Sequence, residues 1–211
     1  TLDRTSSGAI PIPAAGANTL YLGNVQLAGA VAATWVLYDR LVEFGGLSGI
    51  TTGAQSVSAV SLPSRGGTGE GCELWMEIHT AIGATPSATV TASYTNQAGT
   101  SGRTATLVGG ITASLPANRA YKFALQDGDT GVQSVQSFSS GTSTGTAGNI
   151  GLSIRKPIQT IPLPLVNVGV VLGYAETGMA VIPTDACLEL VCLATTTSTG
   201  IINGSIQVGQ G

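Results

Sequence analysis

The chain has 211 residues, enough to bury one substantial core, and all-β sandwiches of this length are commonly single domains. Charged residues make up only 9% of it, against roughly 25% in an average soluble protein. A surface with so few ions does little to repel neighbouring molecules, so we expect much of it to be covered by other subunits. The net charge of -3, with only eight scattered lysines and arginines, argues against nucleic-acid binding, which needs clustered positive charge.

The three cysteines, Cys72, Cys187 and Cys192, are odd in number and show no CxxC spacing. They fit neither a disulfide framework nor a zinc site, so we expect reduced, buried thiols and no metal or cofactor. The chain does not begin with a basic segment leading into an apolar one, as expected of a cytoplasmic or trimmed product. The longest apolar run, Leu27 to Tyr38, is shorter than the roughly 20 residues of a spanning helix, so we expect no membrane segment.

Residues 1–18 are predicted to form an extended N-terminal arm, because Pro11 and Pro13 bias the residues before them towards extended backbone. Apolar side chains in a loose tail need a dry surface to pack on. Ile10, Pro11, Ile12 and Pro13 are therefore the candidate partner-contact residues. A mobile terminus without a partner is the alternative.

Three elements are predicted between the arm and residue 62. Residues 20–29 and 53–62 each have the composition of a strand. Between them, Leu37, Leu41 and Phe44 recur at helical spacing, and two glycines follow that would end a helix. A short helix is predicted there, and a strand from Trp35 to Val42 remains open as the alternative.

Residues 72–79 predict a clear strand, in which alternate side chains face opposite ways. Cys72, Leu74, Met76 and Ile78 form the apolar side, and Glu73, Trp75, Glu77 and His79 form the other. Two carboxylates on one face suggest acid–base catalysis. No second acid pair supports that role, so a row facing solvent or lining an interface is the stronger interpretation.

The stretch from Ala88 to Val108 is the clearest signal in the chain. Val90, Ala92 and Tyr94 alternate with polar residues, a glycine-containing loop follows, and Ala105 and Leu107 return on the dry side. This pattern predicts a β-hairpin.

Residues 120–126 and 131–138 are predicted strands, joined by a turn that begins at Asp127 and resembles the start of a calcium loop. The twelfth position counted from Asp127 is Phe138, where a calcium loop needs a bidentate glutamate, so we do not predict a calcium site. Residues 139–149 predict an exposed low-complexity loop. Its GxSxG match around Ser143 lacks the following helix and a later histidine, which excludes the nucleophile elbow of a serine hydrolase.

The last third of the chain is predicted to hold strands at 150–155, 166–174, 179–182, 187–194 and 201–208. Prolines at 157, 162 and 164 predict a connection over 156–165 rather than a strand. Asn203-Gly204 can form a tight hairpin turn.

Together these elements predict an all-β fold, an antiparallel β-sandwich or jelly roll with at most one short helix. Residues 19–211 are expected to form a single sandwich domain behind the arm. No credible set of nucleophile, base or metal ligands is present in the sequence, so we expect no catalytic site and no enzyme activity.

Four stretches of the sequence resemble a group of tailed-bacteriophage structural proteins that accompany head genes. They are LYDRLVEFGGLSGITTGAQSVSAVSLPSR, GEGCELWMEIHTAIG, TVTASYTNQAGTSGRTATL and LQDGDTGVQSVQSF. The similarity is clearest from about Tyr38 to Phe138. The group has no well-defined catalytic site, so the resemblance supplies no functional residues.

This resemblance implies a virion structural protein: a decoration or cement protein on the outer capsid surface, with a minor capsid or tail-associated role as the nearby alternative. Such a protein is made in the host bacterial cytoplasm, oligomerises, with a trimer favoured, and binds the major capsid protein. Removing residues 1–15 is then expected to weaken capsid attachment and leave the fold intact. A carbohydrate- or receptor-binding β-sandwich module of a phage tail or adhesion apparatus is the alternative.

Overall fold

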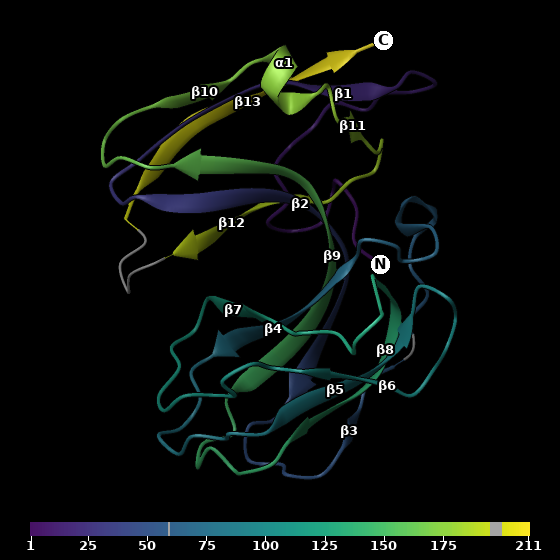
Figure 1. Cartoon of the computed structure of the whole chain (residues 1–211), viewed down its shortest axis with the longest axis vertical. Helices are drawn as coiled ribbons and strands as arrows, with labels where there is room; N and C mark the ends of the chain where they lie inside the picture. Colours follow the sequence, from purple (N-terminus) through teal and green to yellow (C-terminus); the bar gives the residue numbers. More distant parts are fainter. Residues whose placement is uncertain (59, 195–199) are drawn as a thin grey trace. The chain divides into compact units, whose positions relative to one another are not determined.

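A computed structural model describes residues 1–58, 60–194 and 200–211, and nearly all of its regular structure is β (Figure 1). The elements are β1 (Leu20–Gly29), β2 (Ala33–Leu47), β3 (Gln55–Ser56), η1 (Ser64–Gly66), β4 (Glu73–Thr80), β5 (Val90–Asn96), β6 (Arg103–Thr106), β7 (Arg119–Lys122), β8 (Val132–Ser140), β9 (Asn149–Leu163), β10 (Val170–Leu172), α1 (Tyr174–Thr177), β11 (Val181–Ile182), β12 (Leu188–Ala194) and β13 (Ile202–Gln210). None of the described helices is long and apolar enough to cross a membrane.

The contacts divide the chain into two compact units. Unit 1 comprises Leu41–Lys156 with Thr1, and unit 2 comprises Leu2–Arg40 and Pro157–Gly211. Unit 1 is thus inserted into the sequence of unit 2, and the long strands β2 and β9 each contribute residues to both units. The single domain expected over residues 19–211 stays a prediction.

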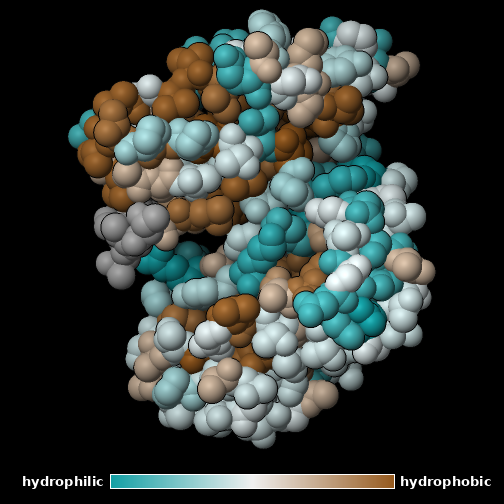
Figure 2. Space-filling model, viewed as in Figure 1, coloured by the Kyte–Doolittle hydropathy of each residue, from teal (hydrophilic) through white to brown (hydrophobic). Residues whose placement is uncertain are grey.

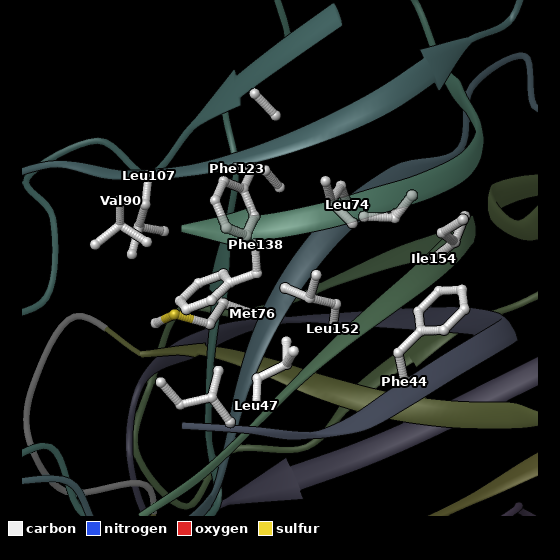
Figure 3. Close-up of a cluster of buried hydrophobic side chains, with 14 of the residues drawn as sticks. Phe44, Leu47, Leu74, Met76, Val90, Leu107, Phe123, Phe138, Leu152 and Ile154 are labelled. Carbon is white, nitrogen blue, oxygen red and sulfur yellow. The ribbon is translucent and has the colours of Figure 1, made fainter. Parts of the chain in front are cut away.

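Unit 1 is a β-sandwich around one hydrophobic core. One layer is the sheet β3-β8-β5-β6, and the other contains β4 and β7 with the unit 1 parts of β2 and β9. Side chains from both layers, among them Phe44, Met76, Phe138 and Leu152, point into a common cluster (Figure 3). The core forms because alternate residues of each strand are apolar, so that each sheet has one face to bury.

Unit 2 has a second, separate core. Strand β1 lies at the centre of a four-stranded sheet, with β13 on one edge and β10 and β11 along the other. Leu20, Leu22, Val25 and Leu27 of β1 are buried with residues of β2, β9 and β12, which supply Leu37, Ile161, Leu163 and Leu188. The expectation of an antiparallel all-β sandwich is confirmed.

Several predicted elements are confirmed in detail. Strand β1 covers the predicted residues 20–29. The predicted hairpin is β5 and β6, with Thr91 opposite Thr106 and Tyr94 opposite Arg103. Its dry side, including Val90, Tyr94 and Leu107, is buried.

Three predictions are wrong, each because local residue types were outweighed by the sheet around them. The helix over Leu37 to Phe44 is absent and the alternative strand from Trp35 to Val42 is confirmed, because these residues belong to β2, where most of their side chains are buried on both faces of a sheet. The connection predicted over 156–165 is largely strand, since β9 continues through Pro157 and Pro162 to Leu163. Asn203-Gly204 makes no turn, because β13 pairs with β1 along its whole length.

Two further segments differ from expectation. Only Gln55–Ser56 of the predicted strand 53–62 is a strand, and residue 59 of that prediction lies outside the described residues. The loop over 139–149 is not simply exposed: Ser140 and Thr144 are fully buried. The backbone N–H of Thr144 donates a hydrogen bond to the carbonyl of Gly49 at 2.9 Å, which attaches the loop to unit 1.

Candidate functional site

The polar side of β4 carries two carboxylates, an indole and the imidazole of the chain, because side chains of a strand alternate between its two faces. Leu74, Met76 and Ile78 enter the unit 1 core, so Glu73, Trp75, Glu77 and His79 face the opposite side of the sheet. This side is not open to solvent as expected, because Trp75 is only 3% exposed and Glu77 only 8%. Burying a charged carboxylate is costly unless a partner compensates it.

Arg155 of β9 supplies that compensation. Its Nη2 donates a hydrogen bond of 2.9 Å to Glu77 Oε1, and its guanidinium lies 5.1 Å from the centre of the Trp75 ring. Arginine suits this position because its flat guanidinium can stack on an aromatic ring while it pairs with a carboxylate. At the end of the row, Lys122 Nζ pairs with Glu73 Oε1 at 2.6 Å, and Trp75 Nε1 donates to Glu73 Oε2 at 3.1 Å.

At the other end of the row, His79 and Glu77 meet Glu43 of β2. These three side chains each offer one ligand atom, and the three atoms lie within 4.8 Å of one another. His79 Nε2 and Glu43 Oε1 are 3.3 Å apart. Glutamate and histidine atoms at this spacing can share a proton or hold a metal ion.

Gly151 makes this meeting possible. The sheet order is β2-β9-β4, so Glu43 and His79 stand on strands that are separated by β9. Gly151 of β9 lies between them, and a Cβ added there would be 2.2 Å from His79 Nε2. Only glycine leaves room for the imidazole to lie over the middle strand.

A second polar cluster lies at the turn that resembles a calcium loop. The Asp129 carboxylate accepts hydrogen bonds from Tyr94 Oη at 2.5 Å, Asn96 Nδ2 at 2.7 Å and Arg103 Nε at 2.8 Å. Arg103, followed by the other donors, lowers the pKa of Asp129 from 3.8 to about 2. Burial, together with the hydrogen bond to Asp129, raises the pKa of Tyr94 to about 12. The carboxylate therefore joins the turn to the β5–β6 hairpin.

The structure places the four predicted partner-contact residues on unit 2. Ile12 is 8% exposed and belongs to the unit 2 core, and the N–H of Ile10 donates to the carbonyl of Leu188 at 2.8 Å. Pro11 and Pro13 are exposed. Ile12 thus already has a dry environment within its own chain, and contact of this arm with another protein stays a prediction.

Exposed apolar side chains gather on a different part of unit 2. All the large hydrophobic residues that are exposed in the described chain belong to unit 2, except Ile50 and Val108. Most lie between residues 165 and 181, which we call the apolar segment: Leu165, Val166, Val168, Val171, Tyr174, Met179 and Val181. Figure 2 shows hydrophobic surface gathered around β10, which is part of this segment.

The apolar segment is held firmly on its inner side. Strands β10 and β11 pair with β1, and Thr177 at the end of α1 donates a hydrogen bond from Oγ1 to the carbonyl of Leu22 at 3.0 Å. Thr177 is buried, whereas Val171 is 59% exposed and Tyr174 is 62% exposed. The segment therefore presents its apolar side chains outward from a fixed backbone.

All three cysteines are free, and Cys72 and Cys187 are buried whereas Cys192 is partly exposed.

Comparisons of the chain with protein-family models, with curated proteins and with solved structures found no match.

The site residue that sequence reasoning missed is Glu43, because nothing local in the sequence shows that β2 lies beside β9. The β4 row itself was predicted from alternation.

Proposed function

We propose that this chain is a non-enzymatic structural protein of a tailed-phage virion, a decoration or cement protein that oligomerises and binds the outer surface of the capsid. The observation that carries this proposal is the apolar segment of unit 2. A hydrogen bond from Thr177 attaches this segment to β1, and its apolar side chains are exposed. Exposed apolar patches on an ordered backbone mark surfaces that bind other proteins.

The charge distribution supports the same role. Residues 157–211 contain no lysine or arginine, and their only acidic residues are Glu176, Asp185 and Glu189. Interface centres are depleted of charge, because each buried ion must be desolvated. A surface of this kind favours association with a protein surface over contact with water or nucleic acid.

A decoration protein works through many modest contacts. Burial of apolar surface contributes about 25 cal/mol per Å². When copies are joined in a symmetric oligomer, binding of the first copy raises the effective concentration of the others, so weak contacts add up to firm attachment. A trimer would match a threefold position of a capsid, and the major capsid protein would be the partner.

The alternative role, in binding carbohydrate or a receptor, has less support. Sugar-binding grooves commonly use exposed aromatic rings. Trp35 is 8% exposed and Trp75 is 3% exposed, so neither tryptophan offers a stacking surface, and Tyr174, which is 62% exposed, stands among the aliphatic side chains of the apolar segment.

The test uses heads of the encoding phage that lack this protein. Purified chain is added back, and co-sedimentation with the heads is measured for wild type, Val171→Asp and Val108→Asp. Val108 is the matched control, because it is also exposed but lies in unit 1. We expect Val171→Asp to lose binding at least tenfold and Val108→Asp to keep it. Absence of the protein from purified virions, or equal binding of both variants, would overturn the proposal.

A further inference from the structure

We propose that Glu43, Glu77 and His79 form a binding site for a divalent transition-metal ion of the zinc type, held between β2 and β4 above Gly151 of β9. This site lies in unit 1 and is independent of the apolar segment of unit 2. The three side chains would leave the fourth position of a tetrahedral ion to water.

The separation of the donor atoms fits one shared ion. Zinc binds histidine nitrogen at about 2.0–2.1 Å and carboxylate oxygen at about 2.0–2.2 Å with tetrahedral angles, which places two such ligand atoms about 3.3 Å apart. His79 Nε2 and Glu43 Oε1 are 3.3 Å apart. The Glu77 ligand atom lies within 4.8 Å of both, so a rotation of its side chain brings it to the same ion.

The orientation of His79 also fits a shared metal ion. His79 Nε2 is shielded from solvent, yet it makes no hydrogen bond within the described residues. Its approach to Glu43 therefore brings the two atoms close without the alignment that a direct hydrogen bond requires. Two ligands of one tetrahedral ion have this relationship, because each donor points at the metal and not at the other donor.

Gly151 provides the space. A Cβ at this position would come within 2.2 Å of Nε2 and would displace the imidazole from its place above β9. The glycine thus keeps open the gap that the three side chains surround.

Arg155 affects both the orientation of Glu77 and the affinity of the site for a cation. Its hydrogen bond to Glu77 orients that carboxylate, as outer partners of metal ligands commonly do. Its positive charge also opposes cation binding, so the affinity must come from strong nitrogen and carboxylate bonds. One imidazole and two carboxylates suit zinc, cobalt or manganese better than calcium, which prefers six to eight oxygens.

The test is calorimetric titration of the full, chelator-stripped chain with zinc chloride, and with calcium chloride for comparison. We expect saturable binding of one zinc ion, and at least tenfold weaker binding by His79→Gln, Glu43→Gln and Gly151→Ala. Glu73→Gln is the control, because Glu73 lies on the same side of β4 and pairs with Lys122 outside the cluster. It should bind zinc as the wild type does.

A second measurement separates loss of the site from loss of the fold. Cobalt, added in place of zinc, should give a visible absorption spectrum typical of four-coordination without a thiolate band, and Cys192→Ser should leave this spectrum unchanged. Circular dichroism of each variant reports whether it is folded. No saturable zinc binding by the wild type, or unchanged binding by a folded His79→Gln, would overturn the proposal.

Discussion

The hydroxyl of Tyr94, in the middle of β5, donates a hydrogen bond of 2.5 Å to the carboxylate of Asp129, which follows it by 35 residues. The same hydroxyl accepts a hydrogen bond of 3.0 Å from the backbone N–H of Gln126. One side chain thus fixes both ends of the turn between β7 and β8 to the neighbouring hairpin. The carboxylate oxygens of Asp129 already accept hydrogen bonds from three side chains, so the role of this residue in the turn is structural.

Replacement of Tyr94 by phenylalanine is expected to lower the free energy of unfolding by about 2–3 kcal/mol, since a hydrogen bond to a charged group is lost and a backbone donor is left without its partner. Tyr121→Phe is the matched control, because the Tyr121 hydroxyl makes no hydrogen bond among the described residues. Urea unfolding of both variants measures the difference. Equal stability of the two would contradict this account of the turn.

Acid should weaken the same connection. The pKa of Asp129 is 3.8 when unperturbed and about 2 in the folded chain, so its ionised form favours folding. This contribution is present above about pH 4 and is lost as the pH falls through about 2. Asp129→Asn lacks it at every pH. The gap in unfolding free energy between wild type and Asp129→Asn should therefore be constant above pH 4 and shrink below it.

Alkali should act on the other partner. The pKa of Tyr94 rises from 10 to about 12 on folding, so the neutral hydroxyl favours the folded state. That contribution is complete below pH 10 and disappears as the pH rises through 12. Denaturation followed between pH 9 and 12 should show a steeper loss of stability in the wild type than in Tyr94→Phe. Parallel pH profiles would show that Tyr94 is not the group responsible.

The N-terminal arm offers a test of packing. Ile12→Ala should cost about 2–4 kcal/mol, because Ile12 is 8% exposed in the unit 2 core and its removal leaves a cavity. Pro13→Ala, at an exposed position, should change stability by less than about 1 kcal/mol. Thermal unfolding of both variants measures this contrast.

This packing also changes the design of the truncation experiment. Deleting residues 1–15 was expected to spare the fold, but it removes Ile12 and Ala15 from the core of unit 2. A loss of capsid attachment would then have two explanations. Substitution of the exposed Pro11 and Pro13 tests partner contact without disturbing that core.

The sequence was most informative where the alternation within a single strand shows which of its side chains are buried. Alternation in β4 and β5 predicted which side chains enter the core, and glycines predicted the hairpin loop. These signals are local, because a strand with one dry face shows it at every second residue. The all-β class follows from many such short patterns.

The parts that failed depend on distant partners. Spacing at Leu37, Leu41 and Phe44 fits a helix, but β9 and β12 flank β2 and impose an extended backbone. Glu43 meets His79 only because Gly151 lies between their strands, and no local pattern relates these three positions. The division into two units leaves only a partial signal in the sequence: the prolines at 157, 162 and 164 begin where the chain returns to unit 2, but no comparable residues stand at Arg40.

That division has a consequence for how the molecule can be altered. The polypeptide passes from unit 2 to unit 1 at Arg40 and returns after Lys156, and these two passages lie on β2 and β9, which are neighbours in one sheet. Residues 41–156 therefore form a cassette with adjoining ends. A different module grafted between the same two strands would leave the pairings of β1 with β10, β11 and β13 intact, so the face that carries the apolar segment can be retained while the inserted half is exchanged.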